Sequence, residues 1–168
     1  MYTLNRYNRE RAINYALLYA SNKNPKYHDY TNEGGNCTNY TSQCIYQGAP
    51  VMNYSQNGWF YKSPALTSAS WANVEPFFQF ATTNTSCGIY AIKTSLAMCE
   101  IGDIIQLKFK DKTRFTHSLI ITQKQGNSPS QIFVCANTRD VKNVPLGNYS
   151  YESLRALHIL GYRTLKQD

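Results

Sequence analysis

The sequence predicts an α+β domain in which helices from the first half of the chain pack on an antiparallel sheet from the second half. Three observations support this fold class. Apolar residues recur at helical spacing near the N-terminus, and short apolar runs separated by turn residues fill the second half. Helices that precede strands, rather than alternating with them, are typical of α+β domains. A length of 168 residues fits one domain, expected to span residues 1–168.

Two helices are expected before residue 50. The first covers about residues 6–20, where apolar side chains recur every three to four positions and Asn5 is suited to cap the N-terminus. The second covers about residues 37–46, between the Gly34-Gly35 turn and Gly48, a residue type that commonly follows the last helical turn.

A third helix is expected near Ser70, with Ser68 or Ser70 itself as the N-cap. Pro76 lacks an N–H group and clashes with a preceding helical turn, so it marks either a helix start or a kink. The aperiodic stretch 49–67 predicts a long ordered loop or lid. We expect its aromatic cluster, residues 59–61, to pack in the core, with a substrate platform as the less favoured alternative.

The second half predicts short antiparallel strands bounded by turn residues. They cover residues 104–109, 115–123, 131–136 and 157–163. Side chains alternate between the two faces of a strand, so Phe115, His117, Leu119 and Ile121 share one face. We therefore expect His117 to project from the face of the sheet that the helices cover.

Cys37 is the candidate nucleophile. It follows the Gly34-Gly35 turn and opens the second helix, where the positive end of the helix stabilises a thiolate. His117 and Asn137 follow downstream in the order Cys, His, Asn. In cysteine hydrolases a histidine takes the thiol proton and an amide oxygen holds the imidazole in the useful tautomer. The sequence therefore predicts Cys37, His117 and Asn137 as catalytic residues, with Asn137 touching the outer ring nitrogen of His117.

The remaining cysteines predict neither a metal site nor a cofactor. The chain has five cysteines and three histidines, without the two-residue spacing of zinc or redox motifs. We interpret four of them as small buried apolar residues: Cys44, Cys87, Cys99 and Cys135. Phosphate-binding and dinucleotide-binding glycine motifs are also absent from the sequence. Acyl transfer by a thiol needs no cofactor, and we expect none.

The net charge of +7 indicates affinity for an anionic partner, such as nucleic acid, acidic lipid or an acidic cell-wall polymer. The basic cluster at residues 108–114 is expected to be a solvated hairpin loop. The sequence has no nucleic-acid-binding motif, which argues against a nucleic-acid partner. It has no run of 18 apolar residues, so a membrane span is not expected. We expect a monomer.

Residues 34–43, Gly-Gly-Asn-Cys-Thr-Asn-Tyr-Thr-Ser-Gln, resemble the nucleophile motif of the bacterial putative amidase domain family. The similarity continues at residues 7–12, 24–27, 70–71, 102–106 and 117–118. That family is grouped with papain-like cell-wall hydrolases, among them the CHAP and NlpC-type peptidases. The resemblance implies a papain-like fold, cysteine-dependent amide or peptide hydrolysis through a thioester acyl-enzyme, and peptidoglycan as substrate. It also implies a location outside the cell or in the cell wall, although the chain starts without a signal segment.

The chain departs from the family pattern at two positions. The family usually has Asp immediately before the cysteine, where this chain has Asn36. It usually has His in the third catalytic position, where this chain reads Ala-Asn-Thr-Arg-Asp with Asn137 in that place. Asp140 is the reserve candidate for orienting His117. The two departures leave an alternative open, a non-catalytic cell-wall-binding module that retains the fold.

Overall fold

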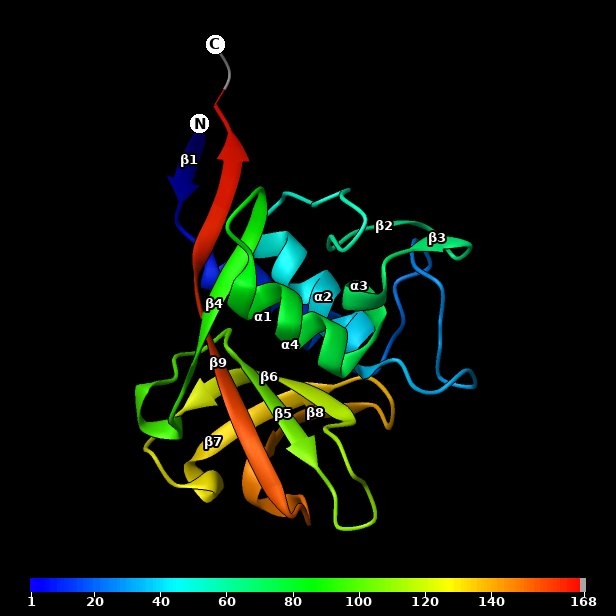
Figure 1. The fold of residues 1–168 in the computed structure, drawn as a ribbon. Coiled ribbons are helices and arrows are strands. Elements are labelled where there is room, and N and C mark those ends of the chain that lie inside the picture. The colour runs from blue at the N-terminus through cyan, green and yellow to red at the C-terminus, as the bar shows by residue number, and fades with distance from the viewer. Residues whose placement is uncertain (167–168) are drawn as a thin grey trace.

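The computed structural model describes residues 1–166 and has the expected α+β architecture. The helices lie together on one side of the large sheet (Figure 1). They are α1 (Arg9–Tyr19), α2 (Cys37–Gly48), α3 (Ala69–Ala72) and α4 (Val74–Thr83). The sheet contains β1 (Tyr2–Asn5), β4 (Gly88–Thr94), β5 (Ile104–Lys108), β6 (His117–Lys124), β7 (Ile132–Ala136), β8 (Val141–Pro145) and β9 (Ser153–Leu165).

The sheet is antiparallel and is organised around its longest strand, β9. The strand order is β1-β9-β5-β6-β7-β8, and β4 also pairs with β9. The first residues of β9 pair with β5, and its last residues pair with β1. In Figure 1, β9 runs along the molecule from the lower strands to the end where the chain starts. The central strands β5 and β6 are thereby fixed between β9 and β7.

Two hydrophobic cores occupy the two faces of this sheet. Ile104, Ile120 and Cys135 face the helices and pack in the larger core. Their neighbours Ile105, Leu119 and Ile121 belong to a second core on the opposite face. Alternation along a strand explains the division, and it decides which face each site residue occupies.

The N-terminal segment differs from the sequence-based expectation. Residues 2–5 form β1, which pairs with the end of β9, and α1 begins only at Arg9. Asn8, not Asn5, is the N-cap, and its side chain accepts a hydrogen bond from the Arg11 amide. The apolar periodicity that predicted α1 does not extend to residues 2–5. These residues form an edge strand because they pair with β9, which is distant in the sequence.

The predicted third helix is two helices. Ser68 caps α3 through a hydrogen bond from the Trp71 amide, in agreement with one of the two expected caps. Helix α4 then begins at Val74, which puts Pro76 in the first turn, where a missing N–H group is tolerated. Strands β4 and β8 were not predicted from the sequence.

The stretch at residues 49–67 is an ordered loop with a short hairpin, β2 (Tyr61–Ser63) and β3 (Leu66–Thr67). Trp59 is fully buried and its ring lies 4.8 Å from that of Trp71. Trp59 therefore packs in the core, as expected, and Tyr61 packs against it half-buried, whereas Phe60 is half-buried against the exposed Tyr54. Within residues 1–166, no helix is both long and apolar enough to span a membrane.

A buried carboxylate ties α1 to the sheet. Asp103 is fully buried and binds Arg9 at 2.6 Å and His158 at 2.7 Å. It also accepts hydrogen bonds from the backbone amides of Glu100 and Ile159. A buried carboxylate needs this full set of partners, so Asp103 fixes the start of α1 against β5 and β9.

Candidate active site

Cys37 is the first residue of α2 and is only 6% exposed. Gly34 and Gly35 precede it with φ of 109° and 114°, a region that favours glycine and permits the sharp turn into the helix. The first amides of α2 have no acceptor within the helix. They form the positive end of the helix, at which Cys37 lies.

The surroundings of Cys37 favour its thiolate. Burial would raise its pKa, but a hydrogen bond with the His117 side chain and the charge of His117 outweigh burial. The Ser118 amide and the Thr38 hydroxyl add smaller contributions, and the resulting pKa lies below its ordinary value. Burial instead raises the pKa of Cys44, Cys99 and Cys135.

His117 lies beside Cys37, but not on the face of the sheet that the sequence predicted. Along β6, Ser118 and Ile120 face the helices, whereas Leu119 and Ile121 face the second core. His117 shares the second face. The prediction that it projects from the helix-covered face is therefore wrong. The two residues meet at the beginning of β6, where the Cys37 sulfur lies 3.9 Å from the Thr116 carbonyl oxygen.

Two aromatic rings flank His117. Its ring centroid lies 6.2 Å from that of Phe109 and 5.8 Å from that of Tyr149. The Tyr149 hydroxyl is buried and has no hydrogen-bond partner among the described residues. Burial and the nearby charges of Cys135 and Cys37 raise the pKa of Tyr149 to about 12. Its hydroxyl is therefore protonated at neutral pH and can donate a hydrogen bond. The sequence analysis did not identify Tyr149, because the residues around it follow no periodic pattern.

Asn137 is fully buried on the helix side of the sheet, where its side chain makes three hydrogen bonds. Its Nδ2 donates to the carbonyl oxygens of Tyr19 at 2.7 Å and Ala20 at 3.1 Å, at the end of α1. Its Oδ1 accepts from Asn36 at 2.8 Å. None of these bonds goes to His117, because the two residues lie on opposite faces of the sheet.

Asn36 extends this contact into a network beneath the nucleophile. Its Oδ1 accepts from the Tyr30 amide at 3.2 Å and from Asn39 Nδ2 at 2.8 Å. Asn39 in turn accepts a hydrogen bond from the Trp71 indole at 2.8 Å. Asp140 is exposed, with φ of 49°, and within the described chain it makes no hydrogen bond to His117. The network positions the turn that carries Cys37.

Two clefts open on either side of the pair. One, of about 480 Å³, is lined by Cys37, the Gly34-Gly35 turn, Glu33 and Glu75. The other, of about 990 Å³, is lined by His117, Tyr149 and four charged residues. Thr116 lines both clefts. The charged residues are Lys110, Lys112, Arg139 and Asp111, of which Lys112 and Asp111 form an ion pair at 3.0 Å.

The wall of the Cys37 cleft is held by a buried arginine. Arg155 binds Glu75 at 3.0 Å and Gln106 at 2.7 Å, and its guanidinium lies between the rings of Phe78 and Phe115. Glu75 also accepts a hydrogen bond from the Phe115 amide. These contacts fix the segment that leads into His117. Among residues 1–166, no group of three or more His, Cys, Asp and Glu side chains is placed to hold a metal ion.

The fold and the site define an α+β protein with a cysteine–histidine pair at a helix N-terminus. The comparisons with known proteins add the family. The model of the family described as "Putative amidase domain" matches residues 6–160, and the chain belongs to this family.

A curated relative, the uncharacterized protein YhbB of Bacillus subtilis, is 32% identical over 155 residues. The match covers 89% of this chain and 46% of the relative, so the chain spans about half the length of the protein it matches. No solved structure matches the chain significantly.

Proposed function

We propose that this protein is a cysteine-dependent amide or peptide hydrolase with Cys37 as nucleophile and His117 as base. The observation that carries the proposal is the position of Cys37, at the first residue of α2 and against the Thr116–His117 segment, where His117 lowers the pKa of the buried thiol. A lowered pKa at a helix N-terminus is typical of reactive cysteines. Membership of an amidase family supports amide bonds as the substrate class.

The reaction proceeds in two acyl transfers. The Cys37 thiolate attacks the amide carbonyl carbon, and the backbone amide of Cys37 donates to the resulting oxyanion. The C–N bond then breaks as protonated His117 gives its proton to the leaving amine, which leaves a thioester on Cys37. In the second step His117 takes a proton from water, the hydroxyl attacks the thioester, and the acid and free thiol are released.

The two clefts suggest how the substrate is oriented. The acyl group is bonded to sulfur in the thioester, so it occupies the cleft lined by Cys37. The leaving amine receives its proton from His117, so it occupies the cleft lined by that residue. Lys110 and Arg139 line this second cleft and favour a leaving amine that carries a carboxylate, as peptides do.

The wider function follows the family resemblance. We propose a papain-like fold relationship, peptidoglycan as the substrate and a location outside the cell or in the cell wall. The net charge of +7 supports binding to an anionic wall. Asn137 acts as a positioning residue for the nucleophile turn, through its bonds to Asn36 and to the end of α1.

The experiment is mass analysis of purified peptidoglycan after incubation with the protein, with Cys37→Ala as the inactive control. We expect new amide-cleaved fragments from the wild type only. Cys99→Ala is the matched control, because Cys99 is buried in the second core and lines neither of the two clefts, and it should retain cleavage.

Iodoacetamide labelling tests the nucleophile independently of the substrate. Peptide mapping should show alkylation fastest at Cys37 and slower at Cys44, Cys99 and Cys135. Slow and equal labelling of these cysteines would exclude Cys37 as an activated thiol. Rapid labelling of Cys37 without wall cleavage would retain the nucleophile and exclude peptidoglycan as its substrate.

A further inference from the structure

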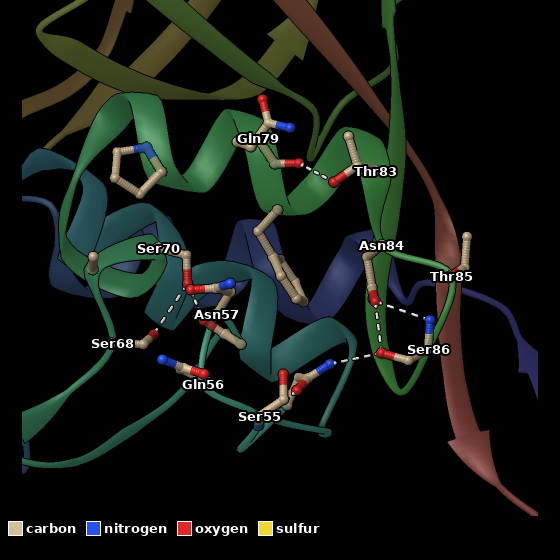
Figure 2. A pocket seen from close by; sticks show the side chains of 15 residues that line it. Ser55, Gln56, Asn57, Ser68, Ser70, Gln79, Thr83, Asn84, Thr85 and Ser86 are labelled. Atoms are coloured by element: carbon tan, nitrogen blue, oxygen red, sulfur yellow. Dashed lines mark hydrogen bonds between the residues drawn. The ribbon is translucent and has the colours of Figure 1, made fainter.

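A further pocket, distinct from the two clefts beside the cysteine–histidine pair, opens between α4 and the loop before β2 (Figure 2). Its volume is about 520 Å³. None of its fifteen lining residues is charged, although charged residues make up 16% of the chain. The polar lining is made of amide and hydroxyl side chains: Asn53, Ser55, Gln56, Asn57, Ser68, Ser70, Gln79, Thr83, Asn84, Thr85 and Ser86.

Part of this lining is fixed by internal hydrogen bonds. Asn53 donates to Ser86 at 2.9 Å and to the Cys87 carbonyl at 2.8 Å. Asn84 accepts from the Ser86 hydroxyl and donates to the Ile89 carbonyl. Gly88, with φ of 106°, makes the turn that brings these residues together. The wall is therefore ordered before any ligand binds.

The side chains at the rim of the pocket, in contrast, are not fixed by internal hydrogen bonds. Within the described part of the chain, the side chains of Ser55, Gln56, Asn57, Gln79 and Thr85 make no hydrogen bonds, and all five residues are exposed. Figure 2 shows these residues coming from the loop below the pocket, from α4 and from the turn after it. Amides and hydroxyls both donate and accept hydrogen bonds, so the rim can bind groups that do the same.

We propose that this pocket binds a neutral sugar. Sugar hydroxyls require partners that donate and accept, which the rim supplies, and a neutral ligand requires no charged partner. A volume of about 520 Å³ is within the usual range of small-ligand sites. Phe80 adds an apolar surface at the base, where it packs against Trp59. An anionic ligand is disfavoured, because the lining contains no Lys or Arg.

The position of the pocket relates it to the candidate active site. Pro76 lines both this pocket and the Cys37 cleft, so the two hollows are separated by the segment of α3 and α4. A glycan that carries an amide-linked chain can therefore contact both. Sugar binding itself does not depend on the proposed reaction of Cys37.

The test uses the full chain and three neutral trisaccharides: cellotriose, maltotriose and triacetylchitotriose. Titration followed by amide chemical shifts should show saturable changes at residues 55–57 and 79–86 with at least one of them. Ala69→Trp fills the pocket from α3 and should abolish binding. Ala65→Trp, in the exposed β2–β3 turn outside the lining, is the matched control. Cys37→Ala should bind as the wild type does.

A smaller change tests the rim. Asn57→Ala should weaken binding by several-fold to about tenfold, the value of one hydrogen bond, whereas Asn127→Ala in an exposed turn should not. Trigalacturonic acid, an anionic trisaccharide, is the control that distinguishes specific binding from attraction to the positive net charge of the protein. No shifts with any neutral trisaccharide, or shifts that persist in Ala69→Trp, would overturn the proposal. The rate of Cys37 alkylation is measured in the same variants, so loss of the sugar site is distinguishable from loss of the thiol.

Discussion

Asn36 donates a hydrogen bond from Nδ2 to Oδ1 of Asn137 at 2.8 Å, so the two positions at which this chain departs from the family pattern contact each other. They lie 101 residues apart in the sequence. By the resemblance, the family's usual residues at these positions are Asp and His, which also form a donor–acceptor pair. We infer that the two departures are one exchange of a hydrogen-bonded pair, located beneath the nucleophile turn.

A double-mutant cycle tests this coupling. Asn36→Asp places a carboxylate oxygen against Asn137 Oδ1 and should destabilise by roughly 1–3 kcal/mol, and Asn137→His should also destabilise because bonds to α1 are lost. The double variant should recover part of the loss, because the imidazole donates to the carboxylate. Urea unfolding should give a favourable coupling of at least about 0.5 kcal/mol. Asn127→Asp combined with Asn137→His should be additive. Additivity at positions 36 and 137 would contradict the exchange.

Asn137→Asp separates positioning of the nucleophile turn from orientation of His117. If Asn137 oriented His117, the carboxylate of the variant would do so equally well. In the structure, however, this carboxylate would face the carbonyl oxygens of Tyr19 and Ala20. We expect a loss of roughly 2–3 kcal/mol in unfolding free energy and slower Cys37 alkylation, with Asn127→Asp unaffected. A stable Asn137→Asp protein with normal alkylation would support orientation of His117 instead.

The pH dependence of alkylation reports the Cys37 thiolate. Because the pKa of Cys37 is lowered, the rate should rise with pH and reach its plateau below the pH expected for an ordinary cysteine. His117→Ala removes the hydrogen bond and the charge that oppose burial, so the pKa should rise and the profile should move to higher pH. The alkylation rate is measured by stopped-flow or mass spectrometry. An unchanged profile in His117→Ala would show that the helix, not His117, sets the pKa.

Tyr149 is expected to act in two ways that two variants distinguish. Its ring packs on His117, and its buried hydroxyl has no partner in the described structure. Tyr149→Phe keeps the ring, so alkylation should be unchanged while kcat falls by up to roughly tenfold, the value of one hydrogen bond to substrate. Tyr149→Ala should slow alkylation as well. Equal kcat in the wild type and Tyr149→Phe would leave the ring as the only contributor.

The cleft lined by His117, Lys110 and Arg139 is expected to select the leaving group. Changing both Lys110 and Arg139 to Gln should raise KM about tenfold for an amide whose leaving amine carries a carboxylate. It should leave KM unchanged when that carboxylate is capped as an amide. Lys26→Gln, outside both clefts, is the control for net charge. Equal effects on the two substrates would contradict recognition of the carboxylate.

The local elements were largely predictable from the sequence. The signals are the apolar periodicity of α1, the turn before α2 and the apolar runs of β5, β6 and β7. Each of these signals depends only on residues that are close in the sequence. Strands β1, β4 and β8 were missed, because their pairing partners are distant and their own apolar patterns are weak. Pro76 correctly indicated a helix boundary, since its backbone constraint is local.

The sequence by itself determined the fold class and the candidate thiol and histidine. A helix start after two glycines and a strand with alternating burial are properties of neighbouring residues. Only the tertiary structure decided that His117 and Asn137 lie on opposite faces of the sheet and that Asn137 binds Asn36. The facing of a strand depends on which of its two sides the helices cover, and both sides of β6 are apolar because each packs in its own core. Alternation alone cannot distinguish two buried faces.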